Sequence, residues 1–310
     1  MLEIKNFSKE YSKGKKAVDN ISLTVNSGEI FGFIGHNGAG KTTTIKSIVG
    51  ILEFSEGDIL IDSKSIKKNP IECKKVMAYI PDNPDLYEAL TGIQYLSFIA
   101  DIYKISKEQR EKLIKYYGDK LELTKYLGDL ISSYSHGMKQ KLAVISALIH
   151  KPKLLILDEP SVGLDPKASH TLKEIMRELC NEGSAIFFST HVLEVAEKLC
   201  DKIAIIKDGK IVAEGTTEQV KGNNSLEEVF MERDKYNILV KLLKNKKNII
   251  LQGAPGVGKT YAAKRLAYSL IGRKDEDKIK MIQFHQNYSY EDFIMGFRPE
   301  EDGSFKLRNG

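Results

Sequence analysis

Two glycine-rich segments of this chain have the residue types and spacing of a loop that wraps around phosphate groups. Gly35–Thr42 and Gly253–Thr260 both fit the pattern G-x-x-x-x-G-K-[ST]. Glycines let backbone N–H groups turn toward phosphate oxygens, while the lysine reaches the terminal phosphates and the threonine hydroxyl can hold Mg²⁺. Both segments lie between a strand-like run and a helical pattern, which favours phosphate binding over a flexible turn. The candidate ligands are Gly35, Asn37, Gly38, Gly40, Lys41, Thr42 and Thr43 in the first segment, and Gly256, Gly258, Lys259 and Thr260 in the second.

A pair of adjacent carboxylates follows a short apolar run. The run Leu154–Leu157 is typical of a buried parallel strand, and Asp158 and Glu159 come directly after it. A phosphate loop needs a metal-holding carboxylate at the end of a neighbouring strand, and a carboxylate one residue further on can polarise an attacking water. Alone, the pair is also compatible with a plain strand end. Together with a phosphate loop, it predicts that Asp158 holds Mg²⁺ and that Glu159 is catalytic.

A capped helix is predicted between the first loop and the carboxylates. Ser135 lies within Tyr134–Gln140, directly before an apolar stripe with helical spacing, and a serine at this place is a good N-cap. The pattern is compatible with a capped helix and nothing more. It is equally compatible with a second helix N-terminus that binds phosphate. Spacing alone leaves both alternatives open.

The elements around these residues alternate between strand and helix signals. A helix is predicted after the first loop, and a helix-rich stretch from about Leu86 to His150. Lys207–Lys210 predicts a hairpin turn in which Asp-Gly supplies the positive φ values. The alternation implies an α/β sheet covered by helices. The predicted strands are Leu2–Phe7, Ile21–Val25, Glu29–Ile34, Leu154–Leu157, Ala185–Ser189 and Ile203–Ile206.

Length and composition limit the classes of protein that fit. A chain of 310 residues suggests about two domains. Hydrophobic residues make up 42% and charged residues 29%, which argues against wholesale disorder. No apolar run approaches the roughly 18 residues that a membrane span needs, and the first residues have no signal-peptide pattern. A formal charge of +5 permits contact with nucleic acid or a membrane surface but argues for neither. The 3 cysteines are far apart in the sequence, which disfavours a disulfide framework or zinc site and fits a reducing cytosol.

The segment from Met1 to about Glu232 resembles the ATP-binding subunit of an ABC transporter. Tyr134–Gln140 is similar to the family's signature sequence, and Ser161–Pro166 to the loop after its metal-binding strand. His191 resembles the switch histidine, and Tyr11 lies where the family stacks an aromatic ring on adenine. The resemblance implies a P-loop NTPase fold of the ABC type, with a mixed sheet and a helical subdomain, over residues 1–232.

The resemblance also implies a mechanism and partners. In this family two copies close head to tail, and each ATP lies between the phosphate loop of one subunit and the signature of the other. Ser135 and Gly137 would then serve the neighbour's nucleotide. Since the chain has no membrane segment, the pore would be a separate permease, and the chain would be cytoplasmic and peripheral on the inner face of the membrane. Tyr79–Pro84 is similar to exporters of the ABC-2 type.

Two residues depart from the family pattern. His136 replaces the first signature glycine, so its side chain could crowd or contact the terminal phosphate. Asp82 stands where many members carry glutamine, in the loop that senses the membrane partner and touches metal or water. Neither departure removes the carboxylate predicted to be catalytic.

The character of the chain changes around Met231–Lys235, and a second domain is predicted over 233–310. Asn248–Leu251 reads as a strand, and apolar residues from Ala263 to Leu270 as the helix after the second loop. With the stretch from Gln283 to Phe293, this segment resembles the start of the AAA+ module of McrB-like NTPases.

By this analogy the second module stops in mid-fold at Gly310, and no apolar strand ending in Asp-Glu follows Lys259. We therefore expect a truncated P-loop domain that does not hydrolyse nucleotide. An alternative function is a nucleic-acid-linked AAA+ motor with the ABC part as accessory. The sequence shows no strong basic patch with interleaved aromatics to support it.

Overall fold

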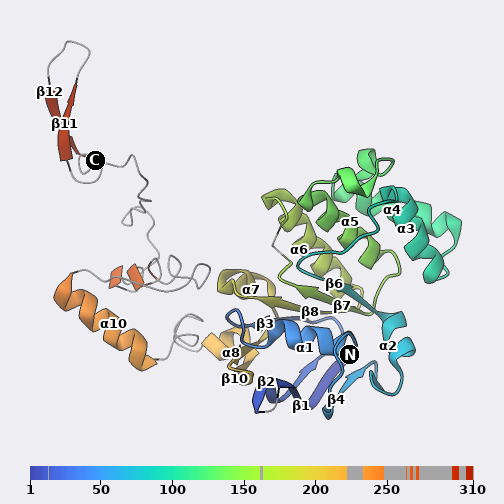
Figure 1. The fold of residues 1–310 in the computed structure, drawn as a ribbon, viewed down its shortest axis with the longest axis horizontal. Coiled ribbons are helices and arrows are strands. Elements are labelled where there is room, and N and C mark those ends of the chain that lie inside the picture. Colours follow the sequence, from blue (N-terminus) through green and yellow to red (C-terminus); the bar gives the residue numbers. More distant parts are fainter. Residues whose placement is uncertain are drawn as a thin grey trace. The chain divides into compact units, whose positions relative to one another are not determined.

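The computed structural model describes residues 1–12, 14–160, 163–221 and 233–247, five helical residues between 263 and 271, and strands at 295–299 and 305–309. The chain divides into two units, Met1–Leu239 and Val240–Gly310. Figure 1 labels the helices and strands of the described residues. No helix among the described residues combines the length and apolar character needed to cross a bilayer.

The central sheet of the first unit is mixed and carries the site. Its strand order is β10-β9-β3-β8-β7-β6. Neighbours pair in parallel except β9 and β10, which form an antiparallel hairpin. Strands β3, β7 and β8 are buried along their whole length, as expected for sheet strands covered on both faces. The bounds are β3 Ile30–Ile34, β6 Met77–Ile80, β7 Leu154–Asp158, β8 Ala185–Thr190, β9 Lys202–Lys207 and β10 Lys210–Thr216.

A second, antiparallel sheet has the order β2-β1-β4-β5. Its first strand runs well beyond the predicted end at Phe7, because the polar residues that follow continue to pair with the next strand through several register shifts. A pattern of apolar residues cannot detect an extension that rests on backbone pairing. The bounds are β1 Leu2–Ser12, β2 Lys15–Val25, β4 Glu56–Ile61 and β5 Lys64–Ser65.

The predicted helix-rich stretch divides into three α-helices, which gather in one region of Figure 1. They are α3 Gly92–Ile102, α4 Lys107–Lys120 and α5 His136–Leu148, with 3₁₀ turns at Thr124–Tyr126 and Ile131–Ser133 between the last two. The other helices that lie wholly within the described residues of the first unit are α1 Lys41–Ile48, α2 Pro70–Val76, α6 Pro166–Asn181, α7 Leu193–Leu199 and α8 Thr217–Lys221. The mixed sheet with a helical subdomain confirms the predicted α/β P-loop fold class.

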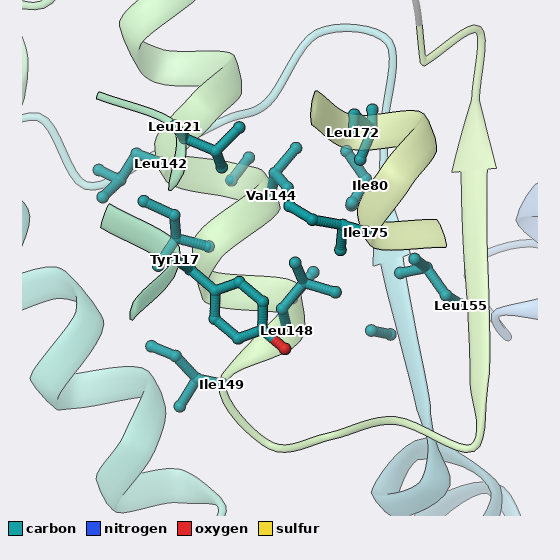
Figure 2. Packing of buried hydrophobic residues seen from close by; sticks show 14 of the residues in the cluster. Ile80, Tyr117, Leu121, Leu142, Val144, Leu148, Ile149, Leu155, Leu172 and Ile175 are labelled. Atoms are coloured by element: carbon teal, nitrogen blue, oxygen red, sulfur yellow. The ribbon is translucent and has the colours of Figure 1, made fainter. Parts of the chain in front are cut away.

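One hydrophobic cluster joins the helical subdomain to the central sheet. Figure 2 shows Leu142, Val144 and Leu148 of α5 together with Ile175 of α6 and Leu155 of β7. All of these side chains are buried, so α5 is fixed against the sheet by apolar packing. Packing in the core therefore determines where the N-terminus of α5 lies.

The predicted hairpin turn is present between β9 and β10. Asp208 has φ 48° and Gly209 has φ 78°, the positive values that a tight two-residue turn requires. The N–H of Gly209 donates to the carbonyl oxygen of Ala39 at 3.0 Å. The turn therefore also supports the phosphate loop.

In the second unit the described residues are few. The helix α10 (Arg233–Lys246) crosses the boundary between the units, and Ala263, Leu266 and Leu270 are helical, as predicted. Strands β11 (Met295–Pro299) and β12 (Phe305–Asn309) pair antiparallel. The second phosphate loop, with Gly256, Gly258, Lys259 and Thr260, lies outside the described residues, as does the strand predicted at Asn248–Leu251.

Candidate functional site

The first phosphate loop connects β3 to α1, as the sequence predicts. Its glycines are required by space as well as by conformation. Gly40 has φ 110°, and a Cβ there would lie 2.6 Å from the carbonyl oxygen of Ala17. A Cβ on Gly35 would lie 2.7 Å from the carbonyl oxygen of Ile206. Glycine at these positions lets the loop pass close to its neighbours and turn into α1.

The lysine of this loop is held by contacts within the chain. Nζ of Lys41 donates to the carbonyl oxygens of Gly35 at 2.7 Å and His36 at 3.3 Å. It also lies 3.3 Å from Oε1 of Glu159, and its side chain is only 5% exposed. The ammonium group is therefore fixed at the loop by backbone oxygens and one carboxylate.

Asp158 ends β7 and has the environment of a cation ligand. The hydroxyl of Ser189 donates to its Oδ1, while Oδ2 is buried without a hydrogen-bond partner among the described residues. Burial raises the pKa of Asp158, and the hydroxyls of Ser189 and Thr42 oppose this rise. A buried carboxylate oxygen that lacks a partner, beside a threonine hydroxyl, fits Mg²⁺, which binds oxygen ligands.

Glu159 joins the phosphate loop to His191. Its Oε1 faces Lys41, and its Oε2 lies 2.9 Å from Nδ1 of His191, which is half exposed. The backbone of Glu159 has φ 49°, an uncommon value for a residue with a side chain, and its N–H donates to the hydroxyl of Ser189 at 3.0 Å. The structure thus brings together four residues that the sequence singles out: Lys41, Asp158, Glu159 and His191.

Tyr11 lies beside the start of α1. Its hydroxyl is 3.3 Å from Oγ1 of Thr43, and the residue is 60% exposed. The ammonium of Lys9 lies 5.5 Å from the ring centroid. An exposed aromatic ring next to a phosphate loop offers a face on which a nucleotide base can stack.

Ser135 is the predicted N-cap of α5, and its hydroxyl accepts from the N–H of Met138 at 3.3 Å. In the part of the chain that the structure describes, no hydrogen bond joins Ser135 or Gly137 to the phosphate loop.

Asp82 lies near the cation site, because its charge contributes to the raised pKa of Asp158. Its Oδ1 accepts from the N–H of Asn83 at 2.9 Å.

Sequence reasoning missed two polar residues that organise the site. The hydroxyl of Ser189 holds both the side chain of Asp158 and the backbone of Glu159. The side chain of Gln140 is fully buried and donates to the carbonyl oxygen of Pro81 at 3.3 Å, which ties α5 to the segment of Asp82. For Ser189 the available signal was a hydroxyl at the end of an otherwise apolar strand.

Comparison with family models gives two matches. The model described as ABC transporter matches residues 18–162. A weak match, described as Novel STAND NTPase 3, covers residues 230–300. The second match is to an NTPase family other than the McrB-like one, so the McrB-like resemblance stays a prediction.

Individual proteins match the first part of the chain. The Uncharacterized ABC transporter ATP-binding protein YhcH of Bacillus subtilis is 40% identical over 68% of this chain and 68% of its own. A solved structure of an ATP binding subunit of ABC transporter has a TM-score of 0.72 and 36% identity, over 76% of this chain and 100% of that one. A dimeric ATP-binding cassette in a post-hydrolysis state with ADP and Pi has a TM-score of 0.64 and 24% identity, over 70% of this chain and 98% of that one. With a phosphate loop and paired carboxylates in one fold, and these relatives, the chain belongs to the ATP-binding proteins of ABC transporters.

Proposed function

We propose that the first unit hydrolyses ATP at the loop Gly35–Thr42 to drive an exporter whose membrane pore is a separate permease. The observation that carries this proposal is the contact of Glu159 with both Lys41 and His191 at one phosphate loop. A carboxylate at this place can polarise a water for in-line attack, and a lysine can stabilise phosphate charge.

The roles of the site residues follow from their positions. Backbone N–H groups of the loop, with Asn37 and Thr43 at its edges, would bind phosphate oxygens, and Tyr11 would stack on the base. Thr42 and Asp158 would hold Mg²⁺, which when bound neutralises phosphate charge. His191 would orient Glu159 and the attacking water through its Nδ1 contact.

A second copy of the chain would complete the site. The capped N-terminus of α5 is exposed at Ser135 and makes no described hydrogen bond to its own phosphate loop. N–H groups at a helix N-terminus favour an anion, so this end suits the nucleotide of a partner. The dimeric cassette noted above is a precedent for that fold. We propose a head-to-tail pair, either two copies or this chain with a related ATPase subunit.

The permease would dock beside the segment of Asp82. Tyr87 and Phe98 are 61% and 44% exposed. The centroids of their rings lie 5.8 Å apart in an edge-to-face arrangement. An exposed aromatic pair next to a segment that reaches the cation site can link docking to catalysis. Docking there would place the chain on the inner face of the membrane. The export direction rests on the similarity of Tyr79–Pro84 to ABC-2 exporters.

Membrane capture tests the permease. We expect the tagged chain, produced in its own organism, to co-purify from solubilised membranes with a polypeptide of several apolar spans. Phe98→Asp should lower this capture about tenfold, because it buries a charge in the interface, with basal ATP hydrolysis retained. Ile71→Asp, at an exposed apolar residue of α2, is the matched control and should leave capture unchanged. Equal capture of the two variants would contradict this docking surface.

The second phosphate loop is proposed to be inactive. Within residues 260–310 no apolar run ends in Asp-Glu, so this stretch supplies no water-polarising carboxylate of that type to the loop. We expect the purified chain to hydrolyse ATP in the presence of Mg²⁺. Lys259→Ala should change the rate by no more than about twofold, which corresponds to roughly 0.5 kcal/mol in activation free energy. A tenfold loss in a variant that melts like the wild type would show that the second loop contributes.

A further inference from the structure

We propose that His136 is a positioning residue that holds the segment after the catalytic carboxylate against the N-terminus of α5. This inference rests on the proposed function and concerns how one chain links its own nucleotide to that of its partner. The sequence suggests that the side chain of His136 could crowd or contact a terminal phosphate. In the structure its ring lies against Gly163 of the same chain.

The ring of His136 covers the side of Gly163 that a side chain would occupy. A Cβ on Gly163 would lie 2.4 Å from Nε2 and 2.6 Å from Cδ2 of His136. Gly163 also has φ 83°, which favours glycine. The backbone conformation therefore favours glycine at this position, and the exposed ring of His136 lies against it. The two residues make a contact between α5 and the segment that precedes α6.

Two further contacts join the same parts of the chain. A Cβ on Gly137 would lie 3.1 Å from the carbonyl oxygen of Gly163, so the second residue of α5 also touches this peptide. One turn further along α5, Nζ of Lys141 lies 3.0 Å from Oδ2 of Asp165. The N–H of Ala168 and the ammonium of Lys141 hold the pKa of Asp165 below its ordinary value.

The contacts of His136, Gly137 and Lys141 with Gly163 and Asp165 form a junction. This junction lies between two parts of the proposed ATPase site. Glu159 lies four residues before Gly163 in the sequence, and its carboxylate contacts Lys41 of the chain's own phosphate loop. The first turn of α5 carries Ser135 as its cap and is the end proposed to meet the partner's nucleotide. The contact of the His136 ring with Gly163 therefore joins the first turn of α5 to the chain between Glu159 and α6. In a pair of copies, this contact would set how the two nucleotides are engaged together.

The test separates packing from phosphate binding. We expect His136→Ala to lower kcat for ATP about tenfold with KM little changed, because a looser junction misplaces reacting groups without altering the chain's own phosphate loop. His136→Phe keeps a flat ring and no ring nitrogen, and should retain kcat within about threefold. His170→Ala, at an exposed histidine of α6, is the matched control. A Phe variant as poor as the Ala variant, or a rise in KM for both, would overturn the positioning role.

A double-mutant cycle tests the contact itself. When His136 is present, Gly163→Ala should lower kcat strongly. In the His136→Ala background the fold loss in kcat caused by Gly163→Ala should be about ten times smaller, because removal of the ring frees space for the new Cβ. Thermal melting of each variant identifies loss through unfolding. Additive effects in variants that melt normally would overturn the inference. If the wild-type chain shows no ATP hydrolysis that depends on Glu159, the proposed function fails instead, so the two failures are distinguishable.

Discussion

Glu159→Gln is expected to lower kcat for ATP hydrolysis by about 10³-fold, within the range that a positioned general base contributes. The same substitution should tighten ATP binding about fivefold, which corresponds to roughly 1 kcal/mol. The reason is the ion pair of 3.3 Å between Lys41 and Glu159, which competes with phosphate for the lysine. Glutamine has nearly the same shape and can still contact His191, but it carries no charge to hold Lys41.

The measurement has two parts. Steady-state hydrolysis gives the loss in kcat, and a nucleotide-binding titration at equilibrium gives the change in affinity. Because turnover stops after binding, we also expect a closed dimer to accumulate with ATP, visible as a larger particle in size-exclusion chromatography. Glu108→Gln, at an exposed glutamate of α4, is the control. Hydrolysis by Glu159→Gln at the wild-type rate would contradict the assignment of Glu159 as the catalytic carboxylate.

Asp158→Asn is expected to lower Mg²⁺-dependent hydrolysis about 10²-fold or more while making the nucleotide-free protein more stable. The buried Oδ2 of Asp158 has no partner among the described residues, so its charge costs free energy in the folded state. An amide keeps the shape and removes that charge. Activity and stability should therefore change in opposite directions, as is common where a site holds a strained or unpaired group.

The raised pKa of Asp158 predicts how the stability difference between Asp158→Asn and the wild type varies with pH. Burial raises the pKa of Asp158 above its ordinary 3.8, so the folded state holds the proton more tightly than the unfolded state. The free energy of unfolding therefore falls as pH rises from that ordinary value through the raised one. The melting temperature of Asp158→Asn should exceed that of the wild type most at neutral pH, and the gap should narrow toward pH values of about 4.

Asp165 is a contrasting control, because its pKa is lowered by the Ala168 N–H and by Lys141. Its charge stabilises the fold above its ordinary pKa, and this contribution is lost as pH falls. Asp165→Asn should therefore melt at a lower temperature than the wild type near neutral pH. A nucleotide-free Asp158→Asn protein that also melts lower than the wild type would contradict our description of Asp158 as a buried carboxylate with one oxygen that lacks a partner among the described residues.

Features whose interactions close within a few residues of the chain could be predicted from the amino-acid sequence. A phosphate loop needs a strand, a glycine-rich turn and a helix in immediate succession, so Gly35–Thr42 could be recognised from spacing alone. The same holds for the cap at Ser135 and for the turn at Asp208-Gly209, where each interaction closes within a few residues.

Which distant side chains meet depends on the order of the strands and on the packing of the helices. The central sheet places β8 between β3 and β7, so residues at the end of β8 can reach the phosphate loop on one side and Asp158 on the other. This order explains why Ser189 holds the carboxylate pair and why His191 contacts Glu159. The apolar pattern of each strand is the same whatever its neighbours are, so strand order cannot be read from it. The ring of His136 on Gly163 has the same origin, because packing of α5 against the sheet, and no local pattern, fixes where that ring lies.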